Sequence, residues 1–172
     1  LNKLDVIVGV ELNVSCPNTN HDDSVEHIVQ MTNLAVNRSR HPVILKLSYD
    51  QPWVECVKRL DGVVAAFDLI NSVAWKTAGE GPSPLRQYGL VGGVSGPRIK
   101  RFAREALAKW SEAVPRHAVR SPVISGGGID SYAEVKERFK MGANAVSFGT
   151  IFITRPWLPN QIAAKWRNRF GS

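Results

Sequence analysis

The sequence has few of the residues that crosslink or anchor a protein. It contains only two cysteines among 172 residues, Cys16 and Cys56, which are too few for a disulfide framework and fit no metal-binding spacing. No apolar run approaches the roughly 20 residues that cross a bilayer, and no charged-then-apolar leader opens the sequence. We therefore expect neither a metal site nor a membrane anchor, and we predict a reducing, cytoplasmic setting.

Acidic residues are also in the minority, and the formal net charge is +7. Such a balance can indicate binding to nucleic acid or to an anionic surface. The basic residues gather between Arg98 and Lys109 and between Lys165 and Arg169, and those in the first group alternate with apolar residues at helical spacing. This pattern favours a helix with a solvated basic face, so we expect no nucleic acid partner. Strongly salt-dependent binding would contradict that expectation.

The apolar pattern predicts alternating strands and helices. Apolar runs rich in β-branched residues, each followed by a helical pattern, are typical of parallel β/α units buried on both faces. The expected strands are 6–13, 42–47, 62–70, 122–124 and 145–148, and the expected helices are 24–38, 52–60, 97–113, 131–141 and 159–170. Ser131 and Glu134 resemble a capping box at the start of the fourth helix. The stretch 73–91, rich in Gly, Pro and Ser, is expected to be an irregular lid or binding loop.

The number of units predicts part of a barrel. A β/α barrel needs eight strands, and the sequence shows five. We therefore predict an α/β fold, a TIM (β/α)8 barrel of which residues 1–172 form about the last five β/α units of a single domain. The first strand would leave an open apolar edge, which is an aggregation liability, so we expect the chain alone to fold poorly.

The segment ELNVSCPNT at 11–19 carries the most chemistry. It follows the apolar run 6–10, which predicts a buried strand ending in a loop that presents one thiol, Cys16, and two amides, Asn13 and Asn18. Pro17 fixes its own φ and favours an extended Cys16, and asparagine amides suit a flat heterocycle with carbonyl and N–H groups. From the spacing alone, a small buried cysteine and turn-forming asparagines explain the segment equally well.

Two glycine-rich loops and one lysine suggest an anionic ligand. Gly126–Gly128 and Gly149-Thr150 follow the fourth and fifth expected strands, and the loops after the last two strands of a barrel often bind phosphate. Tight turns are the alternative reason for these glycines. Lys46 lies inside an apolar strand, where a buried cation needs a partner. Most of these residues follow strand ends, where barrels place their active sites.

Other conspicuous side chains are expected to be structural. Cys56 lies on a predicted helix among apolar residues and is predicted to be in the core. Trp110, Trp157 and Trp166 are predicted to anchor helices to the barrel.

Six segments follow one another in a specific order: NVSCPN at 13–18, ILKLS at 44–48, LINS at 69–72, GGVSG at 92–96, SGGGI at 125–129 and SFGT at 147–150. In this order they resemble motifs of the dihydroorotate dehydrogenases, flavin enzymes of pyrimidine synthesis. Each motif is weak alone, but together they extend over about residues 5–152. The resemblance implies a barrel that binds FMN and oxidises dihydroorotate to orotate.

The resemblance also implies roles for individual residues. Cys16 resembles the base that removes a proton from C5 of dihydroorotate while hydride passes from C6 to N5 of the flavin, and a cysteine here is similar to the soluble branch of the family. The expected substrate-binding residues are Asn13, Asn18, Asn71 and Ser72. The expected FMN-binding residues are Asn13, Lys46, Ile70, Ser95, Gly96, Gly127, Gly128, Gly149 and Thr150, with Lys46 against the flavin ring.

Alternative functions stay open at this point. A related flavin dehydrogenase acting on another dihydropyrimidine, such as dihydrouracil, shares the GGVSG segment, although Asn18 favours orotate. A non-catalytic FMN- or phosphate-binding barrel is a second alternative. The resemblance implies a homodimer and an electron-transfer partner, but the electron acceptor (fumarate, a quinone or NAD) is not indicated by the residues. The segment 19–23 departs from the Pro-Gly pair that many relatives carry there.

Overall fold

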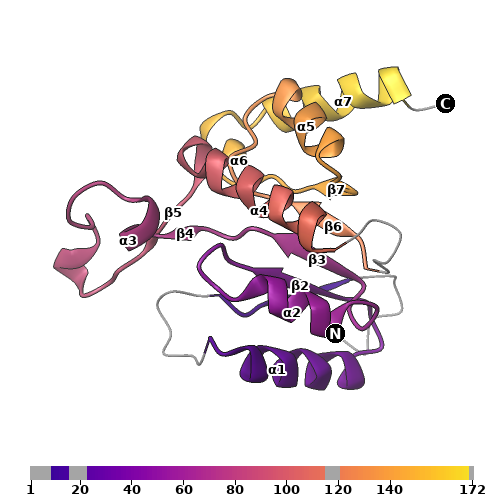
Figure 1. Cartoon of the computed structure of the whole chain (residues 1–172). Helices are drawn as coiled ribbons and strands as arrows, with labels where there is room; N and C mark the ends of the chain where they lie inside the picture. Colours follow the sequence, from indigo (N-terminus) through magenta and orange to yellow (C-terminus); the bar gives the residue numbers. More distant parts are fainter. Residues whose placement is uncertain (1–8, 16–22, 115–120, 171–172) are drawn as a thin grey trace.

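A parallel sheet of five strands lies at the centre of the molecule (Figure 1). The computed structural model describes residues 9–15, 23–114 and 121–170. The strands are β1 (Val10–Asn13), β2 (Val43–Leu47), β3 (Ala66–Leu69), β6 (Val123–Ser125) and β7 (Ala145–Val146), and they lie side by side in this order. Spatial order follows chain order, as in a β/α barrel and unlike a doubly wound sheet.

Helices connect these strands. The long helices are α1 (Val25–Arg38), α2 (Trp53–Leu60), α4 (Lys100–Ala113), α5 (Tyr132–Lys140) and α7 (Leu158–Phe170), and the short ones are α3 (Trp75–Ala78), α6 (Ile151–Thr154), η1 (Arg86–Tyr88) and η2 (Gly96–Ile99). Ser24 caps α1 by accepting from the N–H of His27, and Ser131 caps α5 by accepting from the N–H of Glu134 at 3.2 Å. The serine half of the predicted capping box is therefore confirmed.

The five predicted strands and five predicted helices are present, but the third and the last strand are shorter than predicted. The third, expected from Gly62, begins at Ala66 because residues 61–65 form a turn in which Gly62 has a φ of 76°. The last, expected over 145–148, ends at Val146. The first is described only from residue 9 and is a strand from Val10.

The stretch 73–91 contains regular structure, so the prediction that it is irregular is wrong. β4 (Val73–Ala74) pairs antiparallel with β5 (Gly93–Val94), and the chain between them projects away from the sheet (Figure 1). The indole N–H of Trp75 donates to the carbonyl of Gly81 at 2.9 Å, and the N–H of Ala74 donates to Asp50 at 2.8 Å. The first bond lies within the projecting stretch, and the second joins it to the β2–α2 loop. A role in binding stays a prediction.

The main core lies between the sheet and the helices that cover its outer face. Leu45 and Leu47 of β2 are fully buried, whereas Lys46 between them points to the opposite face, as the alternation of a strand requires. Phe67 of β3 packs against Trp110 of α4 with their ring centres 5.4 Å apart. Cys56 is also fully buried, so its prediction as a core residue is confirmed.

The tryptophans do not all anchor helices. Trp110 is buried in the main core, and Trp166 of α7 stacks on Phe139 of α5 with ring centres 4.4 Å apart in a smaller second core. Trp157 precedes α7 and is 59% exposed. The prediction for Trp157 is therefore wrong, because a large apolar residue after a strand need not face the core.

Both outer strands of the described sheet have an open edge. β1 pairs with β2 alone and β7 with β6 alone among the described residues, and an open edge exposes unpaired backbone N–H and C=O groups. Poor folding of the chain alone follows from this edge and stays a prediction. No helix within the described ranges has both the length and the apolar character needed to cross a membrane.

Candidate active site at the carboxyl ends of the strands

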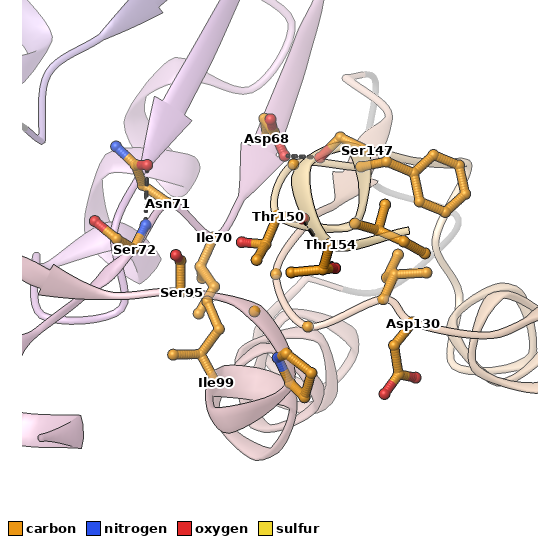
Figure 2. Close-up of a pocket in the computed structure, with 18 of the residues that line it drawn as sticks. Asp68, Ile70, Asn71, Ser72, Ser95, Ile99, Asp130, Ser147, Thr150 and Thr154 are labelled. Carbon is orange, nitrogen blue, oxygen red and sulfur yellow. Dashed lines mark hydrogen bonds between the residues drawn. The ribbon is translucent and has the colours of Figure 1, made fainter. Parts of the chain in front are cut away.

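A cavity of about 310 Å³ lies at the carboxyl ends of the strands (Figure 2). This size is at the lower end of the roughly 300–1,000 Å³ of small-molecule sites. Parallel strands of a barrel end at one face, so the loops that follow them meet there. The lining residues are Glu11, Lys46, Asp68, Ile70, Asn71, Ser72, Ser95, Gly96, Pro97, Ile99, Gly127, Gly128, Ile129, Asp130, Ser147, Phe148, Gly149, Thr150, Ile151, Thr154 and Arg155.

One wall of the cavity carries an ion-pair cluster around Lys46. In the register of the sheet Lys46 is the partner of Asn13 on β1 and of Asp68 on β3. The ammonium of Lys46 lies 2.9 Å from Glu11 Oε1 and 3.2 Å from Asp68 Oδ2. Asp68 in turn accepts from the hydroxyl of Ser147 at 3.3 Å, a bond drawn in Figure 2. The charge of Lys46 is therefore shared between two carboxylates.

The environment shifts the pKa values of this cluster. Burial acts to lower the pKa of Lys46, but the hydrogen bond from its ammonium to Glu11 and the charges of Asp68 and Glu11 outweigh burial and raise it above its usual value. The carboxyl of Asp68 is 1% exposed. Burial raises its pKa, although the charge of Lys46 opposes the shift. Lys46 thus stays cationic at neutral pH.

A network of amides and hydroxyls joins the ends of β1 and β3. The side-chain amide of Asn71 donates to Asn13 Oδ1 at 3.1 Å and to the hydroxyl of Ser15 at 2.8 Å. The hydroxyl of Ser15 donates to the same oxygen of Asn13 at 3.0 Å, and Asn71 Oδ1 accepts from the N–H of Ser72 at 2.9 Å. The network fixes the residue that directly precedes Cys16.

Gln51 holds both flanks of the segment 16–22, which lies outside the described residues. Its side-chain amide donates to the carbonyl of Val14 and to Asp23 Oδ1, each at 2.7 Å. Its side-chain oxygen accepts from the N–H of Ser48 at 3.0 Å, and the residue is buried. The β2–α2 loop therefore sets the distance between the two flanks.

Glycine backbone forms another part of the cavity wall. Gly127 and Gly128 have φ values of 81° and 74°, in the left-handed region that favours glycine. A Cβ on Gly128 would lie 2.7 Å from the backbone of Lys100, so no larger residue fits there. Among the described residues neither N–H of this pair has a hydrogen-bond partner. Free backbone N–H groups that line a cavity suit an anion such as a phosphate.

The structure brings most predicted ligand residues together. Asn71, Ser72 and eight of the nine predicted FMN-binding residues line the cavity. The ninth, Asn13, lies beside it and accepts from Asn71. Cys16 and Asn18 fall outside the described residues. The ligand roles of all these residues stay predictions.

Sequence analysis missed the carboxylates Glu11 and Asp68. The need of a buried lysine for a partner was a usable signal, because Asp68 is the only acidic residue in the apolar run 62–70. Glu11 lies two residues before Asn13 and so faces the same side of β1. Thr154 and Arg155 also line the cavity, and nothing in their local sequence indicates it; Ser147 lines it too and is the first residue of the SFGT segment.

Comparison with known proteins assigns the family. The family model described as "Dihydroorotate dehydrogenase" matches residues 2–169. The chain belongs to the dihydroorotate dehydrogenase family. It is 32% identical over 171 residues to "Dihydroorotate dehydrogenase B (NAD(+)), catalytic subunit" of Geobacillus sp. (strain WCH70), covering 95% of this chain and 53% of the relative. A candidate dihydroorotate dehydrogenase A (fumarate) of Solibacter usitatus is 33% identical, covering 91% and 52%.

Solved structures agree on the fold. A DHODH of Eimeria tenella in complex with ferulenol superimposes with a TM-score of 0.72 and 17% identity, covering 93% of this chain and 49% of that one. The predicted β/α barrel fold is therefore confirmed. The chain spans about half the length of the family members it matches, in agreement with five strands of an eight-stranded barrel.

Proposed function

We propose that this chain contributes the FMN-binding portion of a dihydroorotate dehydrogenase that oxidises dihydroorotate to orotate. The proposal depends on one observation above the others: in a member of this family, a single cavity gathers lysine, amides and bare glycine N–H groups from the ends of the strands. Because the chain spans about half of its relatives, the activity is proposed for the closed barrel.

The cavity fits FMN in two respects. The unpartnered N–H groups of Gly127 and Gly128 provide an anion site for its phosphate. At the other end Lys46, cationic and held by Glu11 and Asp68, presents charge beside the place proposed for the isoalloxazine ring. Bound FMN would supply the hydride acceptor. Ile70, Ser95, Gly96, Gly149 and Thr150 would complete its binding site.

Substrate binding is proposed for the amide end of the cavity. Asn13, Asn71 and Ser72 lie there, and Asn18 would join them. Cys16 directly follows Ser15, which Asn71 holds. As a thiolate, Cys16 would take the proton from C5 of dihydroorotate while hydride leaves C6, so that the C5–C6 bond becomes a double bond and the thiol keeps the proton. A free thiol has a pKa of about 8.5, so the site would have to favour the thiolate.

The electron-transfer partner, the oligomeric state and the cellular location are also proposed from similarity. Relatives carry names of both the NAD(+) type and the fumarate type, and a catalytic subunit of the first type implies a second subunit that passes electrons onward. We propose an electron-transfer partner, a homodimer and a cytoplasmic location on the strength of this similarity.

The test uses a hybrid barrel, in which the half of the Geobacillus relative that this chain does not match is joined to it. The purified hybrid is examined for flavin absorbance and mixed with dihydroorotate without oxygen. We expect bleaching that Cys16→Ala slows by orders of magnitude at neutral pH. Cys56→Ala, which removes the buried thiol of α2, is the matched control and should leave the rate within about twofold.

Other outcomes would change the assignment. Bleaching by dihydrouracil instead of dihydroorotate would move the protein to the related dihydropyrimidine activity. Bound flavin that no dihydropyrimidine bleaches would support the non-catalytic FMN-binding barrel. A folded hybrid without flavin would contradict the proposed function as a whole.

A further inference from the structure

The largest fully buried side chain among the described residues is that of Arg138 on α5. This cation does not line the cavity. A guanidinium taken out of water is costly unless its donors are all engaged. The position of Arg138 behind the glycine loop therefore calls for an explanation beyond packing.

The donors of Arg138 reach three separate segments. Its Nε donates to Glu134 Oε1 at 2.7 Å, one turn earlier on α5. Its Nη1 donates to the hydroxyl of Ser125, at the end of β6, at 2.9 Å, and its Nη2 donates to the carbonyl of Gly127 at 3.0 Å. Longer bonds reach the carbonyls of Gly126 and Lys100, at 3.5 and 3.4 Å. One planar group thus holds the β6–α5 loop against the start of α4.

These bonds determine how the loop presents its N–H groups. In a trans peptide the C=O and the following N–H point in opposite directions. The carbonyl of Gly127 points at Arg138, so the N–H of Gly128 points away from it. The weaker bond to the carbonyl of Gly126 turns the N–H of Gly127 in the same manner. Both residues line the cavity, and both N–H groups are unpartnered within the described structure.

Charged side chains lie around the loop, and one of them, Asp130, lines the cavity. Glu134 also accepts from Arg104, and Lys100 lies 2.8 Å from Asp130. Three cations (Lys100, Arg104 and Arg138) thus lie near three carboxylates, because Glu137 also acts on Arg104 beside Asp130 and Glu134, and the charges of the group balance. A hydrogen bond from a cation to a carbonyl also polarises the peptide group, which makes its N–H a stronger donor.

We propose that Arg138 is a positioning residue for anion binding: it holds the carbonyls of Gly126 and Gly127 so that the N–H groups of Gly127 and Gly128 are directed at a phosphate in the cavity. The identity of that phosphate as the one of FMN rests on the proposed function above. The orientation of the loop by Arg138 does not.

The test compares Arg138→Lys with Arg104→Lys in the hybrid barrel. Arg104 shares the partner Glu134 but touches no loop carbonyl, so it is the matched control. Binding of FMN and of riboflavin is measured by fluorescence titration, because the ratio of the two affinities isolates the phosphate. We expect Arg138→Lys to lower that ratio about tenfold, as for hydrogen bonds that depend on a charged group, and Arg104→Lys to change it less than about twofold.

Hydrogen exchange of the peptide covering residues 125–129, recorded without ligand, is the second readout. Arg138→Lys should speed exchange there more than Arg104→Lys does, while exchange in β2 stays unchanged. If the unsubstituted protein binds neither flavin, the proposed function fails, and the exchange result alone decides the role of Arg138. Equal affinity ratios or equal loop exchange in the two variants would overturn the proposal.

Discussion

Two clusters of charged side chains differ in where they lie: the cluster around Lys46 lines the cavity, and the cluster around Arg138 lies behind the glycine loop. Around Lys46 the charges face the cavity, and the side chains of Lys46 and Glu11 keep 22% and 43% of their surface exposed. Around Arg138 they lie behind the glycine loop, and the side chains of Arg138 and Glu134 keep 0% and 2%. The contrast concerns these four side chains, because Asp68 of the first cluster is 1% exposed and Arg104 of the second is 44% exposed. The energetic consequences of breaking each should differ accordingly.

The largest loss of stability is expected for Glu134→Gln. This change leaves the guanidinium of Arg138 buried without its counter-charge, and breaking a buried pair in this way costs about 3–5 kcal/mol. Urea unfolding of the hybrid barrel, monitored by circular dichroism, measures it, with Glu112→Gln on the exposed face of α4 as the control. A loss below about 1 kcal/mol would show that Arg138 does not depend on Glu134.

A smaller loss is expected for Lys46→Met. Asp68 then stays buried without its cation, but its pKa is already raised by burial, so it can take up a proton, and Glu11 can turn to water. We expect a cost of about 1–3 kcal/mol at neutral pH in the same unfolding measurement. Lys58→Met removes an exposed pair with Glu55 and should cost less than about 0.5 kcal/mol. A cost for Lys46→Met as large as that for Glu134→Gln would remove the contrast between the clusters.

The two clusters should respond to acid in opposite directions. Burial acts to raise the pKa of Glu134, but hydrogen bonds from Arg104 and Arg138 hold it below its usual 4.5. Its contribution to stability is therefore complete above pH 4.5 and is lost as the pH falls through the lower folded value. The pKa of Asp68 lies above its usual 3.8, so its contribution grows as the pH falls through the folded value.

Unfolding measured at several pH values with Glu134→Gln and Asp68→Asn tests this contrast. The stability difference between the unsubstituted protein and Glu134→Gln should shrink towards low pH. The difference between the unsubstituted protein and Asp68→Asn should move in the other direction. Parallel pH profiles would mean that the two clusters are electrostatically alike.

The smallest effect is expected for Asp68→Asn at neutral pH. The amide keeps the shape of the carboxyl, and Lys46 retains Glu11 at 2.9 Å, so stability should change by less than about 1 kcal/mol. The pKa of Lys46 should fall, because one of the two charges that raise it is gone. Lysine-selective NMR titration measures this. An unchanged pKa would show that Glu11 alone holds the ammonium.

The fold could be predicted from sequence because the apolar pattern and the positions of the motif residues indicate the same architecture. Apolar runs alternate with amphipathic helices, and motif residues follow the strands, so a barrel with its site at the strand ends was predictable. The sequence carried a signal for Asp68 as the partner of Lys46, but the strand register that places the two side chains opposite each other could not be predicted. The antiparallel pair of β4 and β5 could not be predicted either, because two-residue strands leave no periodic signal.

Arg138 shows a second limit of sequence reasoning. Glu134 and Arg138 are four residues apart on a helix, a spacing that usually indicates a solvated ion pair. The structure buries this pair because the hydroxyl of Ser125 and the carbonyls of the loop after β6 supply the acceptors that water would otherwise provide. These acceptors lie outside the helix, so the sequence of α5 does not predict them, and the support that Arg138 gives the loop is visible only in the structure.

Gln51 has a consequence for how this site can change. Since it anchors Val14 and Asp23 from outside the intervening segment, the span that the segment must bridge is independent of the segment's own sequence. Doubling the length of a loop between fixed ends costs only about 0.6 kcal/mol of closure entropy. Residues 19–22 of the segment are therefore a natural place for insertion or exchange, whereas Cys16 and Asn18, which belong to the proposed site, would have to be kept.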